Sequence, residues 1–174
     1  MDKKIIVGIM CFILIWLSYL LQINFLNEFA LFGVRPNIAI VVTTGIALLS
    51  GKIPGMLVGI SYGLIYDLMF GKSIGLYILL YGLLGFLLGR YSNGFSKDNK
   101  LAVVYMVAVS TLITETINYL VSVILYGYSF ELLAPILILI KETIYNMILA
   151  RLLYGVFTSI SEIINKCKNS YYLL

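Results

Sequence analysis

The chain has 174 residues, of which 61% are hydrophobic and only 11% are charged, with a mean hydropathy of +1.03. A soluble domain is closer to half apolar and a quarter charged, so this composition predicts an all-α integral membrane protein. The net charge of +4 comes from basic residues scattered between apolar segments. That distribution excludes a nucleic-acid-binding patch and favours contact with a lipid bilayer. The length is compatible with a single polytopic domain over residues 1–174.

The residue types also exclude several kinds of catalytic site. The chain contains no histidine, and its two cysteines are Cys11 and Cys167. A zinc site built from His and Cys, a His-dependent triad and a Cys-His pair are therefore not available. Only one aspartate, Asp67, lies inside an apolar segment, whereas an intramembrane aspartyl protease needs two. The sequence thus predicts a protein that is not an enzyme and has no metal or cofactor.

Six apolar segments follow one another along the chain, and each is expected to form a transmembrane helix. The first is read as a retained span, because a cleaved signal peptide would have a shorter apolar core. The second is short for a full crossing, so it is either buried among longer helices or thins the bilayer locally. The predicted spans are 5–26, 36–50, 54–70, 74–91, 101–126 and 135–160.

The distribution of lysine and arginine predicts the orientation of these spans. With both termini in the cytoplasm, eight basic residues fall in inner segments and two in outer ones, which satisfies the positive-inside rule. The inner residues are Lys3, Lys4, Lys52, Arg90, Lys97, Lys100, Lys166 and Lys168, the outer ones are Arg35 and Lys72, and Lys141 and Arg151 fall within the last span.

Glycines recur every four residues in the third predicted span, at Gly55, Gly59 and Gly63, and Asp67 and Gly71 continue the spacing. Four residues turn an α-helix by about 400°, so these positions share one face. Such a face lets another helix approach backbone to backbone. We consider two interpretations, packing within the protein and contact with a separate protein. The fourth span carries a second set of close-packing positions, namely Gly82, Gly85 and Gly89.

Charged residues inside a span cost about 2.5–3.5 kcal/mol each, so each needs a partner or a function. The second span begins at its outer side with Arg35, Pro36 and Asn37. Asp67 lies at a similar depth, near the outer end of the third span. We therefore predict that Arg35 and Asp67 approach within about 6 Å and pair. This polar corner either supports the fold or receives a partner chain.

A polar stripe runs along the fifth span, at Thr111, Glu115, Asn118 and Ser122, and points into the bundle, a cavity or another protein. The sixth span also contains polar residues, namely Lys141, Glu142 and Asn146. We predict a buried network of Glu115, Asn118, Lys141 and Asn146, in which the lysine pairs with Glu115. Intramembrane carboxylates also serve as relays in ion-coupled carriers, although no inverted repeat supports that function here.

Two motifs give the chain a family resemblance. The Arg35-Pro36-Asn37 element and the run Asp67-Leu68-Met69-Phe70-Gly71-Lys72-Ser73-Ile74-Gly75-Leu76 resemble the MreD family, the small integral membrane component of the bacterial rod-shape machinery. The match is strongest over residues 35–90, and Gly71 and Gly75 belong to it. The last two spans carry no recognised motif.

The resemblance implies a non-enzymatic membrane scaffold. Members of this family associate with MreC, a membrane-anchored protein, and together they link the MreB filament inside to peptidoglycan synthases outside. In fold, the family resembles the substrate-binding S components of energy-coupling-factor transporters. The alternative function is therefore a small-molecule-binding subunit, which would need an outward-facing cavity of about 300 Å³ or more with converging polar groups.

Overall fold

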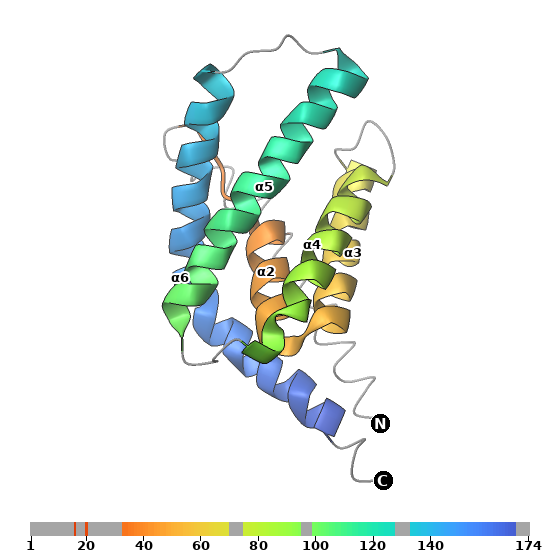
Figure 1. Cartoon of the computed structure of the whole chain (residues 1–174), viewed down its shortest axis with the longest axis vertical. Helices are drawn as coiled ribbons and strands as arrows, with labels where there is room; N and C mark the ends of the chain where they lie inside the picture. The colour runs from red at the N-terminus through yellow and green to blue at the C-terminus, as the bar shows by residue number, and fades with distance from the viewer. Residues whose placement is uncertain are drawn as a thin grey trace.

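The computed structural model describes residues 16, 20, 33–69, 75–94, 99–127 and 133–169, and within these ranges it is helical without strands (Figure 1). The all-α prediction is confirmed for this part of the chain. Of the predicted first span, only Trp16 and Leu20 are described, and both are helical. The helices are α2 (Ile38–Ser50), α3 (Lys52–Met69), α4 (Leu76–Arg90), the short 3-10 helix η2 (Ser92–Gly94), α5 (Lys100–Tyr126) and α6 (Leu133–Asn169).

Two of the described helices, α5 and α6, are long and apolar enough to cross a membrane by length and composition. Helix α5 has 27 residues and is therefore about 40 Å long. Helices α2 and α4 are apolar but shorter, at 13 and 15 residues. Each of the five described α-helices coincides in sequence with one of the predicted apolar segments. Helix α6 extends beyond the predicted end at residue 160.

Helix α2 is the centre of the bundle, because all 13 of its residues are buried. It contacts α3, α4, α5 and α6, which enclose it. A helix that is hydrophobic all round has no face to present to water, so it is stable only when it is surrounded. Of the two options for this short segment, burial among longer helices is the one observed. The helix ends at Gly51, whose φ of 102° suits glycine and turns the chain directly into α3.

Helices α3 and α4 form an antiparallel hairpin whose backbones meet at glycines. A Cβ atom at Gly59 would collide with the backbone of Tyr81, and one at Gly63 with that of Ile78. Gly55 faces Gly85 across the same contact and also lies against Ala47 of α2, while Gly89 lies against Lys52. These five glycines are therefore used for packing within the protein, the first of the two interpretations. They do not form an exposed face for a partner, because α4 and α3 cover them.

The other predicted packing glycines have different surroundings. A Cβ atom at Gly82 would meet only the side chain of Ile60, at 3.0 Å. Gly75 has a φ of 116° and nothing within 4 Å of a Cβ position, so it serves as the turn before α4 rather than as a contact. Gly71 lies outside the described residues. The glycines that the sequence suggested for helix packing therefore have two different functions: most permit close helix contact, whereas Gly75 permits a turn.

Helix α6 changes direction in its second half, so that its C-terminal part crosses the end of the bundle (Figure 1). The hydroxyls of Thr158 and Ser159 both donate to the Gly155 carbonyl, at 2.9 Å each, and such local bonds bend helices. Phe157, within the bend, packs on Gly45 of α2, and beyond the bend Asn165 Nδ2 donates to the Leu49 carbonyl at 3.2 Å. This continuation closes the end of α2, which explains why the helix extends past residue 160.

Candidate functional site

Asn37 is the hub of a buried polar network at the first turn of α2. Its side-chain oxygen accepts from the Ile40 amide at 3.3 Å and caps the helix. Its side-chain amide donates to the Tyr81 hydroxyl and to Glu115 Oε1, at 3.1 Å each. Both amide hydrogens and the oxygen of a buried asparagine are thus used, which is the condition for burying such a group without a large penalty.

Asn146 of α6 completes the surroundings of Asn37. Its Oδ1 accepts from the Asn37 backbone amide at 2.8 Å, and its Nδ2 donates to Thr111 Oγ1 at 3.0 Å. Asn146 and Thr111 are both fully buried. The network therefore connects α2, α4, α5 and α6 around the start of α2, where unsatisfied helix amides would otherwise lie inside the bundle.

Glu115 contributes a carboxyl group to this network near the middle of α5, and it forms no ion pair with any of the described residues. Its Oε1 accepts from Asn37 at the N-terminus of α2, where the aligned peptide dipoles favour negative charge. Glu142 of α6 is half-buried and close enough to Glu115 for electrostatic interaction. The two carboxyl groups therefore share one region of the bundle.

Three tyrosines from α3 and α4 pack beside the network. The Tyr66 ring lies 5.6 Å from those of Tyr77 and Tyr81, which are 5.8 Å apart. Asn118 Nδ2 donates to the Tyr77 hydroxyl at 3.3 Å, which joins α5 to α4. Sequence analysis did not single out Tyr77 and Tyr81. The available signal was their spacing, because residues 77, 81, 85 and 89 share one face of α4 with the packing glycines.

Asp67 caps the N-terminus of α4. Its carboxylate accepts from the backbone amides of Gly75, Tyr77 and Ile78, at 2.9, 3.1 and 3.1 Å. Gly75 stands at the cap position of α4 and has no side chain, so Asp67 supplies the cap from the neighbouring helix. The side chain is only 2% exposed.

The predicted ion pair between Arg35 and Asp67 is wrong. Three amide donors already occupy the Asp67 carboxylate, while Arg35 is exposed and forms no ion pair within the described ranges. The physical reason is that the first-turn amides of α4 need an acceptor and lie next to Asp67. Within the predicted corner, Pro36 is buried before α2, and Asn37 points into the polar network.

The predicted pairing of Glu115 with Lys141 is also wrong. Lys141 is exposed on α6 and forms no ion pair in the described part of the chain, and Asn37 contacts Glu115 instead. Five residues separate Lys141 from Asn146, which is about 140° around a helix, so the two side chains cannot both face the bundle. Glu142 lies four residues from Asn146 and shares its inward face. The predicted members Glu115 and Asn146 do meet through Asn37.

The hydrogen bonds of this network join α2, α4, α5 and α6 to one another. No group of three or more metal-ligating side chains occurs in the described residues. Every polar contact around Asn37 is a helix cap or an inter-helix hydrogen bond. Outside the network, the helices present apolar side chains, such as Leu57 on α3, Leu83 on α4 and Ile148 on α6. These features define a helical membrane protein with a fixed polar interior and apolar outer faces.

The family model described as rod shape-determining protein MreD matches residues 2–161. The chain therefore belongs to the MreD family, and it is a rod shape-determining membrane protein. This is a structural family, with no known enzymatic activity. No curated protein sequence and no solved structure matches the chain significantly.

Proposed function

We propose that this protein is a membrane scaffold of the bacterial cell-elongation machinery, which binds an MreC-like partner and helps couple cytoplasmic MreB filaments to peptidoglycan synthesis. The family match over residues 2–161 carries this proposal. The architecture supports it, because the described interior is filled by packing and hydrogen bonds, while α3 to α6 carry exposed apolar side chains in the described part of the chain. A protein with little chain outside the membrane acts on both sides through the helices of other membrane proteins.

The proposed topology is a bundle of six spans in the bacterial cytoplasmic membrane, with both termini in the cytoplasm. The basic residues support this orientation through the positive-inside rule. Cys167 near the C-terminal end of α6 offers a direct measurement. A membrane-impermeant maleimide should label it only after the cells are permeabilised. Labelling in intact spheroplasts would contradict the orientation.

Photo-crosslinking in intact membranes tests the scaffold. A photoreactive amino acid is placed at one exposed position on each helix face, namely Leu57, Leu83, Ile117 or Ile148. We expect an adduct with the MreC-like partner from one face and none from the other three, because a specific helix contact is local. Adducts of equal yield from all four faces, or none from any face, would contradict a specific scaffold contact.

The small-molecule alternative makes a different prediction. An S-component-like subunit should hold a ligand among converging polar groups. The groove on the outer side of the α3–α4 hairpin is instead lined by apolar residues and glycine. Purification of the protein with a tightly bound water-soluble vitamin-like molecule would favour the alternative over the scaffold.

A further inference from the structure

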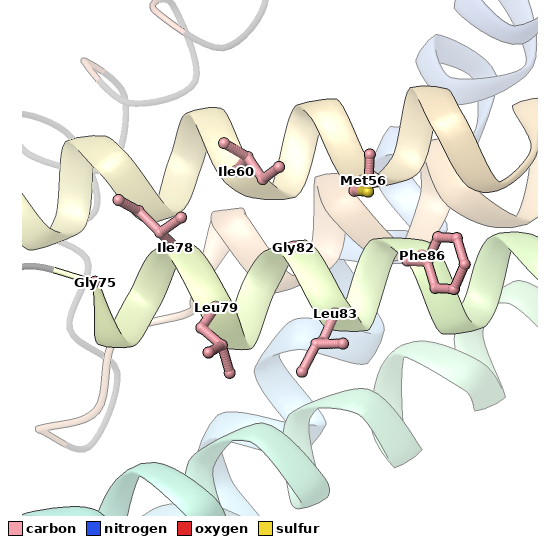
Figure 2. Close-up of a pocket in the computed structure, with 8 residues that line it drawn as sticks. All are labelled: Met56, Ile60, Gly75, Ile78, Leu79, Gly82, Leu83 and Phe86. Carbon is pink, nitrogen blue, oxygen red and sulfur yellow. The ribbon is translucent and has the colours of Figure 1, made fainter.

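A groove of about 520 Å³ runs along the outer side of the α3–α4 hairpin (Figure 2). Met56 and Ile60 project into it from α3, and Ile78 and Phe86 flank it on α4. The remaining lining residues are Gly75, Leu79, Gly82 and Leu83, so the lining contains no charged side chain. The groove is therefore suited to hydrocarbon.

Gly82 explains why the groove exists. It lies opposite Ile60 and between Ile78 and Phe86, and its missing side chain leaves the space between the two helices unfilled (Figure 2). Behind it, the contacts of Gly59 and Gly63 with α4 hold the two backbones together and close the floor. The opening is consequently an open groove along one side of a tightly joined hairpin.

Two cations continue the walls of the groove to one end of the hairpin. Lys52 precedes Met56 by four residues on α3, and Arg90 follows Phe86 by four residues on α4. Residues four apart share a helix face, so each cation extends a stripe that lines the groove. Gly89 packs on the backbone of Lys52, which brings the two helix ends together. Both cations are exposed, and neither forms an ion pair within the described ranges.

We propose that this groove binds an acyl chain of an anionic phospholipid, whose phosphate is held by Lys52 and Arg90. The positive-inside count places these cations at the cytoplasmic surface, where anionic lipids concentrate and attract basic residues. The charge arrangement is complementary to such a lipid, with cations at one end and hydrocarbon along the rest.

The length of the groove matches that of an acyl chain. From Gly75 to Phe86 the helix rises about 16 Å, close to half of the ~30 Å hydrocarbon thickness. One acyl chain spans one leaflet, whereas a transmembrane helix of about 10 Å diameter crosses both leaflets. The groove is therefore long enough for one acyl chain, and the two cations at its end favour a phospholipid as the occupant.

Quenching of tryptophan fluorescence by brominated lipids tests the proposal. In a Trp16→Phe background, Leu83→Trp places the probe in the groove, because Leu83 lines it and is 49% exposed. The protein is reconstituted in vesicles that contain brominated phosphatidylglycerol or brominated phosphatidylcholine. Each cation should increase the affinity for the anionic lipid about five-fold. Half-quenching should therefore need at least five-fold less brominated phosphatidylglycerol than brominated phosphatidylcholine. Replacing both cations, by Lys52→Gln and Arg90→Gln, should bring the ratio to about one.

Matched controls separate a specific site from general membrane attraction. The probe Ile113→Trp, at an exposed position on α5 with no lysine or arginine within one helical turn, should show a ratio of about one. Replacement of another exposed cation, by Arg151→Gln, should leave the groove probe unchanged. If Leu83→Trp does not fold, Leu79→Trp provides a second probe in the same groove.

Three results would overturn the lipid site. The first is equal quenching by both lipids at the groove probe with Lys52 and Arg90 intact. The second is a preference that survives removal of both cations. The third is loss of quenching when the MreC-like partner is reconstituted in the same vesicles, which would assign the groove to a protein helix. The scaffold itself would survive the first two results, because the partner crosslink is measured independently of lipid.

Discussion

Replacement of Gly59 by alanine should strongly destabilise the α3–α4 hairpin. The added Cβ atom collides with the carbonyl of Tyr81, which belongs to a backbone that cannot move without the rest of α4. Relief requires the two helices to separate by about 1 Å, and a gap of that size forfeits a quarter to a half of each contact's dispersion energy. The contacts of Gly55 and Gly63 loosen as well, because they lie on the same face. Overpacking of this kind costs about 1–3 kcal/mol.

Gly155→Ala is the matched control, because Gly155 is also a helical glycine but has nothing within 4 Å of its Cβ position. This change should be neutral or stabilise the protein by about 0.5–1 kcal/mol, through helix propensity alone. Unfolding by SDS titration in mixed micelles measures both variants. We expect Gly59→Ala to be less stable than Gly155→Ala by about 1–3 kcal/mol, because the gain in helix propensity is common to both variants and only the overpacking differs. Equal stability of the two variants would refute close α3–α4 packing.

The corrected contacts make further predictions, which double-mutant cycles in the same unfolding assay can measure. Asp67→Ala should cost about 1–3 kcal/mol through loss of the α4 cap, whereas Arg35→Gln should cost less than about 0.5 kcal/mol. The free-energy effects of these two changes should be additive. A coupling energy above about 1 kcal/mol would instead support an ion pair between Arg35 and Asp67. Glu115→Ala and Lys141→Gln should likewise be additive, since no contact joins them. Asn37→Ala and Glu115→Ala should be coupled by about 0.5–3 kcal/mol, and additivity there would contradict their hydrogen bond.

Local sequence patterns located the helices well. Apolar length and glycine or proline breaks placed α2, α3, α4 and α5 close to their observed positions, because helix boundaries depend mainly on nearby residues. The glycine spacing also indicated close helix approach, and the structure shows that α3 and α4 use it against each other. The extension of α6 past residue 160 was missed, since its contacts with α2 come from more than 100 residues away.

The choice of partners for the polar residues depended on geometry that spacing alone does not contain. Sequence analysis identified Asn37, Asp67, Glu115 and Asn146 as polar groups within apolar segments, because charge and amide groups in lipid need partners whatever the fold. It paired opposite charges, whereas the folded chain satisfies these groups with helix ends and amides. Helix termini are strong donors, but their position relative to another helix is set only when the bundle packs.

The sequence by itself therefore determined that this protein is an apolar helical bundle of the rod-shape family, with glycines for packing and a few obligatory polar contacts. Only the tertiary structure decided that α2 is enclosed on all sides, that Asp67 caps α4, and that Asn37 joins four helices. The physical reason is that periodicity fixes which residues share a face of one helix. Which two faces then meet depends on the packing of the whole bundle, through contacts between residues far apart in the chain.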